Sequence, residues 1–245
     1  MRLKAYAAQT HQGPYLQINE DAYEFDFEND LFMVLDGFGG SGFGDRAVEK
    51  LKAEIKTFYS QLADDPNVTM PLYYNPRNLL EGNAILNSMM NAHQNLFRAN
   101  SDRPINQRAG SSVIVAAKSD SLMVLVGVGN CCAYHFRQGT LSKIIVEDTL
   151  KYLSKNQFET RFRTSPMNAM GMYPELGYQM REVRLLEGDK LVFMTDGFYA
   201  HLSEEEILHH LNRKALDAQD RLNSLLKLSN SHGNLDNQTA MILEF

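Results

Sequence analysis

Apolar runs separated by turn residues divide this chain into strand and helix segments. Residues 31–35, Leu-Phe-Met-Val-Leu, form the clearest run, which is typical of a strand buried on both faces. The run ends on Asp36, and glycines follow at positions 37, 39 and 40. Because glycine lets a ligand approach the backbone closely, this carboxylate is a candidate for a binding site. Asp-Gly is also common in ordinary turns, so the stretch alone leaves both interpretations open.

The first half of the chain predicts short strands and two long helices. The strand segments are residues 2–10, 23–27 and 31–35, and the helix segments are residues 45–61 and 78–100. The turn residues 28–30 make the second and third strands a hairpin, whose open ends bring Glu20 and Asp36 together. Asp45 is placed to cap the first helix. The residues between the two helices are typical of a loop.

The second half of the chain is rich in short strands. They are predicted over residues 112–117, 122–127, 132–137, 140–146, 179–185, 190–195 and 239–245. The turn at residues 187–189 predicts that the two strands flanking it pair with each other. Residues 148–177 contain several prolines and glycines and predict a short helix with loops. Two further helices are predicted, over residues 203–212, where Ser203 and Glu206 form a capping box, and over residues 215–228.

Length and composition favour one globular domain over residues 1–245. The chain is 44% hydrophobic and 22% charged, without a linker or low-complexity tract. Its net charge of -6 argues against a general binder of nucleic acid or anionic membranes. No stretch approaches the roughly 18 apolar residues of a membrane span, and the N-terminus lacks a signal-peptide core. The adjacent Cys131 and Cys132 are expected to stay reduced, which predicts a cytoplasmic protein.

Acidic residues recur at the ends of the predicted strands. They are Glu20, Asp21, Asp36, Asp196 and Asp236. A set of oxygen ligands without His or Cys favours Mg²⁺, Mn²⁺ or Ca²⁺ over Zn²⁺. Clustered carboxylates would repel one another unless a cation neutralised them, and two bridged metal ions suit phosphoester hydrolysis. The alternative is a set of separate turn and cap acids in an unrelated sandwich.

Six short motifs follow one another along the chain. They are Asn19-Glu20-Asp21, Asp36-Gly37-Phe38-Gly39-Gly40, Gly110-Ser111-Ser112, Val128-Gly129-Asn130 with Ala133-Tyr134, Gly188-Asp189 before Thr195-Asp196-Gly197, and Asp236-Asn237. In this order they resemble the metal-dependent Ser/Thr protein phosphatases of the type 2C (PPM) family. The resemblance spans nearly the whole chain and is best to the compact, prokaryotic-type catalytic domain.

The resemblance implies an α+β fold, a four-layer α-β-β-α sandwich of two antiparallel sheets flanked by helices. The site would lie at one end of the sandwich. The implied ligands of two Mn²⁺ or Mg²⁺ ions are Asp36, bridging both, Glu20 and the Gly37 carbonyl on one, and Asp196 and Asp236 on the other. Asp21 would act behind them, holding a metal-bound water.

The implied reaction is hydrolysis of phosphoserine and phosphothreonine on proteins. A water bridging the two metal ions would attack phosphorus directly, without a phosphoenzyme. The implied partners are phosphoprotein substrates, the targets of a Ser/Thr kinase, and the protein is expected to be a monomer.

Two departures from the family pattern concern the substrate. Leu16 occupies the position where bacterial members usually carry a phosphate-binding Arg, and Arg is the natural bidentate partner of phosphate. Lys4 or Arg46 are candidates to replace it. Phe38 occupies the position where animal members often have His, a candidate general acid, so water would protonate the leaving group here.

A third departure concerns the metals. Asn130 stands where the family usually has an Asp that helps to hold a third ion. A third ion on Asn130 and Asp196 is therefore expected to bind weakly or not at all. These departures keep open an alternative function, a catalytically weakened relative that binds a phosphoprotein or regulates a partner.

Overall fold

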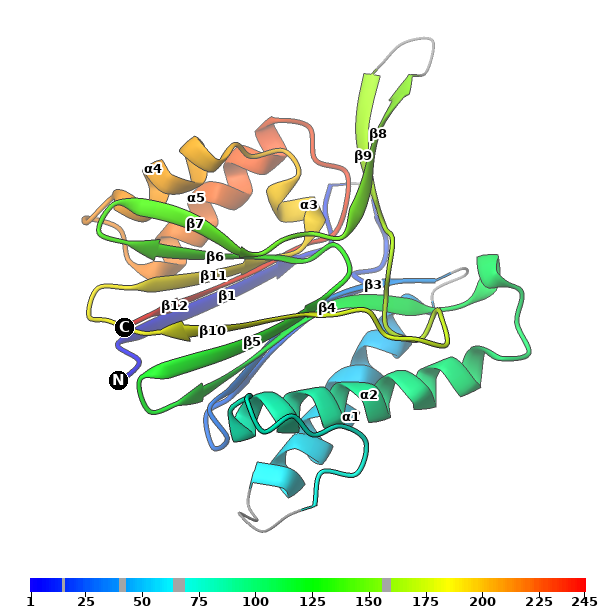
Figure 1. The fold of residues 1–245 in the computed structure, drawn as a ribbon. Coiled ribbons are helices and arrows are strands. Elements are labelled where there is room, and N and C mark those ends of the chain that lie inside the picture. Colours follow the sequence, from blue (N-terminus) through cyan, green and yellow to red (C-terminus); the bar gives the residue numbers. More distant parts are fainter. Residues whose placement is uncertain (15, 40–42, 64–68, 156–159) are drawn as a thin grey trace.

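Two five-stranded antiparallel sheets lie face to face, with helices on each outer face (Figure 1). This computed structural model describes all of residues 1–245 except 15, 40–42, 64–68 and 156–159. The arrangement confirms the predicted α+β sandwich.

The first sheet has the strand order β1-β12-β11-β6-β7. Its strands are β1 (Ala5–His11), β12 (Gln238–Glu244), β11 (Lys190–Met194), β6 (Cys132–Arg137) and β7 (Thr140–Ile145). Three helices cover its outer face: α3 (Asp196–Tyr199), α4 (Glu204–Asn212) and α5 (Ala218–Ser231) (Figure 1). The predicted capping box of α4 is present, because Ser203 and Glu206 exchange their hydrogen bonds.

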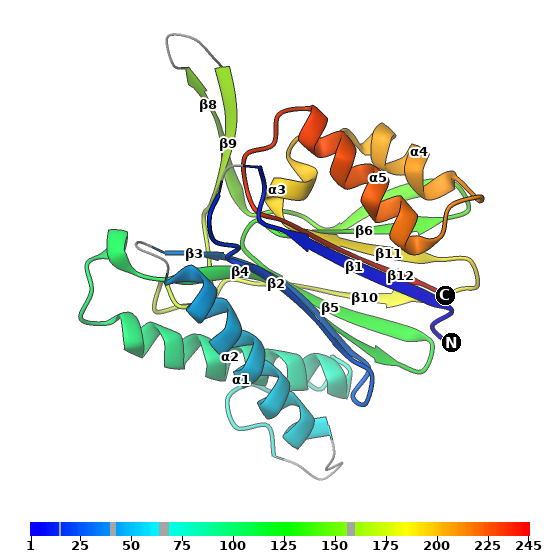
Figure 2. The ribbon, with the colours of Figure 1, turned by 180° about the vertical axis from the view of Figure 1, so that it is seen from behind.

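The second sheet has the strand order β10-β5-β4-β3-β2. Its strands are β10 (Gln179–Arg184), β5 (Leu122–Val128), β4 (Gly110–Ser119), β3 (Leu31–Phe38) and β2 (Asp21–Asp26). Two long helices, α1 (Gly44–Ala63) and α2 (Leu80–Asn100), cover its outer face, and a short 3-10 helix, Ile105–Gln107, follows α2 (Figure 2).

Three apolar clusters hold the four layers together. The central cluster lies between the sheets and includes Phe32, Ile114 and Phe193, all fully buried. The other two clusters join each sheet to its helices. Residues 31–35 alternate between the central cluster and the helix-facing one, which explains why this strand is apolar on both faces.

The strands flanking residues 187–189 do not pair with each other, so that prediction was wrong. β10 pairs with β5 in the second sheet, whereas β11 pairs with β6 and β12 in the first sheet. The turn residues mark a crossing between the two sheets, where Leu185 is buried and the amide of Gly188 donates to the carbonyl of Phe245. A turn sequence sets the local chain direction but does not choose the partners of its strands.

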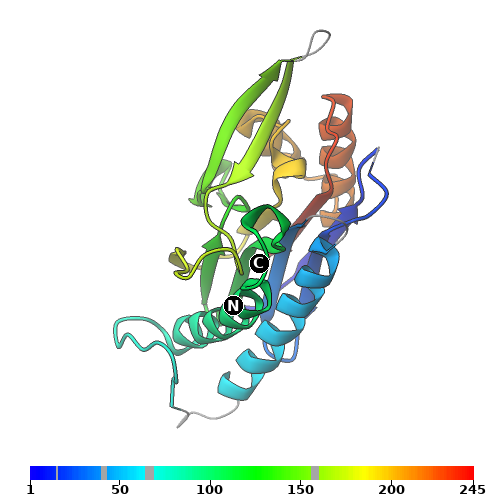
Figure 3. The same cartoon turned by 90° about the vertical axis from the view of Figure 1, so that its right-hand side faces the viewer.

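The prediction of a short helix with loops over residues 148–177 was also wrong. The segment contains a separate antiparallel pair, β8 (Thr149–Lys155) and β9 (Thr160–Pro166). Figure 3 shows this pair projecting beyond the two sheets. The prolines and glycines of residues 148–177 lie at or after the end of β9. They therefore mark where the hairpin ends and are compatible with the two strands before them.

Cys131 and Cys132 are both fully buried, and they form no disulfide. Asp45 lies inside the first turn of α1 instead of capping it. Among the helices in the described residues, none combines the length and apolarity needed to cross a bilayer.

Candidate active site

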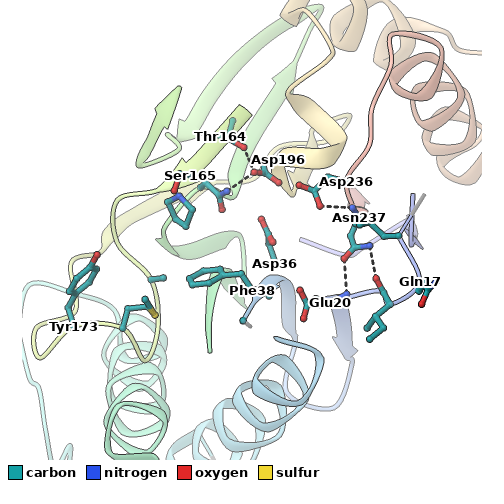
Figure 4. A pocket seen from close by; sticks show the side chains of 18 residues that line it. Gln17, Glu20, Asp36, Phe38, Thr164, Ser165, Tyr173, Asp196, Asp236 and Asn237 are labelled. Carbon is teal, nitrogen blue, oxygen red and sulfur yellow. Dashed lines mark hydrogen bonds between the residues drawn. The ribbon is translucent and has the colours of Figure 1, made fainter. Parts of the chain in front are cut away.

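A pocket of about 730 Å³ opens at the end of the sandwich opposite the two chain termini. Figure 4 shows side chains from several elements pointing into it. The lining includes six residues selected from the sequence: Glu20, Asp36, Gly37, Asn130, Asp196 and Asp236. The fold therefore brings together acids that lie up to 216 positions apart in the sequence.

The hairpin of β2 and β3 positions the first two acids. Asp36 lies within β3, opposite Asp21 on β2 and Ser112 on β4. The amide of Gly37 donates to the backbone carbonyl of Glu20 at 3.0 Å. A Cβ at position 37 would lie 2.5 Å from that carbonyl oxygen, so only glycine permits this approach.

Glu20 also receives a hydrogen bond from a helix. Its Oε1 accepts the amide of Gly44, the first residue of α1, at 3.0 Å. The positive end of a helix dipole stabilises a carboxylate at this location. Glu20, a residue of the pocket, therefore caps one amide at the start of α1, which is the role predicted for Asp45.

Asp21 is the one selected acid that does not line the pocket. It is buried beside Asp36 on the neighbouring strand, and its Oδ2 accepts a hydrogen bond from the hydroxyl of Thr195 at 2.9 Å. Thr195 immediately precedes Asp196, which begins α3. Asp21 therefore links the hairpin of the second sheet to the end of β11 in the first.

Asn237, directly before β12, links that segment to the segment before β2 at the pocket. Its Oδ1 accepts the amide of Glu20 at 2.9 Å, and its Nδ2 donates to the carbonyl of Ile18 at 3.1 Å. Its own amide donates to Oδ1 of Asp236 at 2.8 Å (Figure 4). In the sequence, Asn237 stands out only as part of a motif, yet it positions two of the pocket acids.

Burial and mutual repulsion shift the protonation of these acids. Burial, followed by the neighbouring carboxylates, raises the pKa of Asp36 well above its ordinary value. Burial also raises the pKa of Asp21, Asp196 and Glu20, although hydrogen bonds from Thr195, Thr164 and Gly44 respectively oppose the shift. A nearby cation would reverse these shifts, because it favours the ionised form.

The donor chemistry fits a hard divalent cation. The four carboxylates around the pocket, Glu20, Asp36, Asp196 and Asp236, offer oxygen atoms alone. Oδ1 of Asn130 is buried without a hydrogen-bond partner, and this residue also lines the pocket. As they stand, no three His, Cys, Asp or Glu side chains in the described part of the chain form a complete metal site.

Comparison with known proteins identifies the family. The family model of Protein phosphatase 2C matches residues 16–236. The chain belongs to the protein phosphatase 2C family. No curated protein sequence matches the chain significantly.

Solved bacterial structures share the fold of this phosphatase 2C family member. The PPM Ser-Thr phosphatase MsPP from Mycobacterium smegmatis, in complex with cacodylate, is 21% identical, with full coverage of both chains and a TM-score of 0.77. The Ser/Thr phosphatase of S. agalactiae is 20% identical, with 98% coverage of each chain and a TM-score of 0.78. The catalytic domain of the Ser/Thr phosphatase PstP, solved with two manganese ions, is 21% identical, with 98% and 97% coverage and a TM-score of 0.70.

The pocket of this phosphatase 2C member is poor in positive charge. Among its described lining residues there is no Lys, Arg or His, and Leu16 lies there with 40% of its surface exposed. Lys4 pairs with Glu187 at 2.6 Å at the opposite end of the sandwich, so it does not replace the missing Arg. Arg46, in the first turn of α1, lies outside the pocket lining.

Two polar contacts in the site had no signal in the sequence. The hydroxyl of Thr164, on β9, donates a hydrogen bond to Oδ2 of Asp196. The hydroxyl of Tyr199 donates to the backbone carbonyl of Asn130 at 2.7 Å. Both hydrogen bonds join elements that are distant in sequence, so the local sequence pattern does not predict them. Gly40 of the second motif lies outside the described residues.

Proposed function

We propose that this phosphatase 2C member hydrolyses phosphoserine and phosphothreonine on proteins, with two Mn²⁺ or Mg²⁺ ions in the pocket. The observation that carries the proposal is the convergence of Glu20, Asp36, Asp196 and Asp236 on one pocket, in a chain of this family. When bound, such ions supply a nucleophilic water and neutralise charge on the phosphoryl group.

The positions of the side chains support the proposed ligand roles. Beyond the effect of burial, the charges of Asp196 and Asp236 raise the pKa of Asp36, so Asp36 is the acid that we assign to bridge both ions. Glu20, with the Gly37 carbonyl, would hold one ion, and Asp196 with Asp236 would hold the other. Glu20 and Gly37 lie at the end of the second sheet, whereas Asp196 and Asp236 lie next to strands of the first sheet, so the site assembles only when the two sheets pack.

Residues outside the ligand set orient these acids. Thr195 holds Asp21 beside Asp36, and Asn237 fixes the backbone of Glu20. Buried polar partners of this kind fix the geometry of metal ligands and strengthen their basicity. Asp21 would then orient water in the pocket through its negative charge. Phe38 lines the pocket without a proton to donate, so solvent would protonate the leaving group.

The wider setting of the reaction is part of the same proposal. The partners would be phosphoproteins modified by a Ser/Thr kinase, and the protein would act as a monomeric single domain in the cytoplasm. Cys131 and Cys132, which are buried and form no disulfide, support a reducing compartment. The alternative of a non-catalytic binding module gains no support from the site, since the four pocket acids are all present.

The direct test is metal-dependent hydrolysis of a phosphothreonine peptide and of para-nitrophenyl phosphate. We expect phosphate release with millimolar Mn²⁺ and its loss on adding excess EDTA. A folded, Mn²⁺-loaded protein that releases no phosphate from either compound would contradict the proposal.

A further inference from the structure

The pocket combines acidic residues with an apolar rim. Leu16 and Ile18 line one side, and Phe38, Met172 and Tyr173 also line it. Figure 4 shows Gln17 and Tyr173 at opposite sides of the opening, with Phe38 between Tyr173 and Asp36. Leu16, Ile18 and Tyr173 are 40%, 47% and 41% exposed, so large apolar surface meets water where a substrate would enter.

Hydrogen bonds that are partly or fully buried hold the backbone on both sides of this rim. On one side, Asn237 fixes the carbonyl of Ile18. On the other, Arg108 Nη1 donates to the carbonyl of Met172 at 3.0 Å, and the buried Asn100 donates to the carbonyl of Gly171 at 2.9 Å. A preformed rim loses little conformational entropy when a ligand covers it, so its apolar contacts contribute more to affinity.

Phe38 and Met172 form a continuous apolar wall. A Cβ built on Gly110 would lie 2.7 Å from Phe38 and 2.9 Å from Met172, so both side chains close over this glycine. The wall therefore runs from the strand that carries Asp36 to the segment that carries Tyr173. A substrate side chain that lies against this wall would contact carbon atoms.

The charges that line the pocket restrict which side chains can flank the phosphorylated residue of the substrate. Four carboxylates line the pocket, and two divalent cations would balance them without any surplus. No Lys, Arg or His among the described lining residues remains to balance a phosphate dianion, and the chain as a whole carries a net charge of -6. Acidic residues next to the phosphorylated residue would find no Lys, Arg or His among these described lining residues, and the net negative charge of the chain would disfavour them.

We infer that the preferred substrate is a phosphoserine or phosphothreonine segment with a large apolar side chain next to the phosphorylated residue and no acidic neighbours. This inference rests on the proposed function and names its substrate class. Recognition comes from the apolar rim, where Leu16 and Ile18 are specificity-determining residues, instead of from a guanidinium on the phosphate.

The test compares Mn²⁺-dependent hydrolysis of three phosphothreonine peptides, identical except for leucine, alanine or glutamate on both sides of the phosphothreonine. We expect kcat/KM to be about tenfold or more higher for the leucine peptide than for the alanine peptide, mainly through KM. The glutamate peptide should be the poorest of the three. The double variant Leu16→Ser, Ile18→Ser should reduce the leucine-to-alanine ratio to about twofold or less.

Leu186→Ser is the matched control, because Leu186 is 42% exposed in the crossing between β10 and β11, outside the pocket lining. It should leave the ratio unchanged. Equal kcat/KM for the leucine and alanine peptides, or preference for the glutamate peptide, would overturn the inference and leave the phosphatase proposal intact. Absence of hydrolysis of all three peptides and of para-nitrophenyl phosphate would overturn the phosphatase proposal and this inference with it.

Discussion

The side-chain amide of Asn130 donates a hydrogen bond to Asp196, with 2.7 Å between Nδ2 and Oδ2. The hydroxyl of Thr164 donates to the same oxygen. Two neutral groups thus donate to Oδ2 of Asp196, an oxygen that could otherwise help to bind a further cation. The family resemblance places an Asp at position 130, so this contact replaces a charge with a hydrogen bond.

Asn130→Asp should restore an additional weak metal site. The new carboxylate cannot donate to Asp196 when ionised, and it adds a negative charge to the pocket, so a cation becomes the better partner. Titration calorimetry with Mn²⁺ should show one further weak binding event, and activity should keep rising at Mn²⁺ concentrations that saturate the parent. Asn223→Asp makes the same chemical change on α5, outside the pocket lining, and should add no binding event. Identical Mn²⁺ stoichiometry in parent and Asn130→Asp would contradict this explanation.

Metal binding should stabilise the folded protein. The pocket acids repel one another in the metal-free state, and Mn²⁺ that binds only the folded state adds about 2.7 kcal/mol at a hundred times its Kd. The Tm, followed by circular dichroism, should therefore rise with Mn²⁺ concentration, and the rise should shrink in Asp196→Asn. An unchanged Tm at millimolar Mn²⁺ would argue against a site formed by these residues.

Leu16→Arg should improve the binding of small phosphoesters. A guanidinium at this position of the pocket would add a charge-assisted contact to phosphate, worth roughly 1.5–3 kcal/mol, or about ten- to a hundredfold in KM. The KM for para-nitrophenyl phosphate should fall, while kcat changes less. Leu186→Arg adds the same charge outside the pocket lining and serves as the control. If Leu16→Arg leaves KM unchanged, residue 16 does not face the bound phosphate.

The sequence was most informative where the determinants of structure are local. The apolar run ending at Asp36 predicted its strand and its hairpin with the segment after Glu20, because both strands lie within 18 residues of each other. The capping box at Ser203 was equally local. The acids of the pocket were found because each follows or precedes a recognisable strand.

Features that depend on distant partners escaped prediction. The crossing at Gly188 looks like a hairpin turn, and only the packing of two sheets separates the strands that flank it. The contact between Thr164 and Asp196 depends on where β9 lies, and the sequence pattern around residues 148–177 favoured loops. Asn237 bonds Glu20 across 217 positions, so no local pattern reveals its role.

Asp189, at the far end of the sandwich, should make stability depend on pH. Burial raises the pKa of this carboxyl, but hydrogen bonds from Arg137 and the Leu186 amide, together with His135 Nε2 at 3.1 Å from Oδ2, outweigh burial and hold the pKa below its ordinary value. The carboxylate therefore stabilises the fold above its unfolded pKa of about 3.9, and this stabilisation is lost as pH falls through the lowered native pKa.

Asp189→Asn should lower the free energy of unfolding at pH 7 by about 3 kcal/mol, because it leaves the Arg137 charge without its partner. Urea unfolding at pH 7 and at pH values below 4 should show the difference from the parent shrinking in acid. Glu187→Gln, at a neighbouring exposed acid, should change stability little at either pH. A difference that is constant with pH would show that the Asp189 charge is not responsible.

The central claim is that Asp36 serves both metal ions and thereby the reaction. Asp36→Asn keeps the size and shape of the side chain at a buried strand position, so the far-ultraviolet circular dichroism spectrum should match that of the parent. Asp102→Asn, at an exposed residue outside the pocket lining, is the control and should keep full activity.

The most direct measurement is therefore the rate of phosphate release from a phosphothreonine peptide by folded Asp36→Asn at saturating Mn²⁺. The account predicts a loss on the order of 10²-fold or more, because one charge supports both ions. A folded Asp36→Asn protein that retains more than about a tenth of the parent rate would contradict the assignment of this acid and of the site built around it.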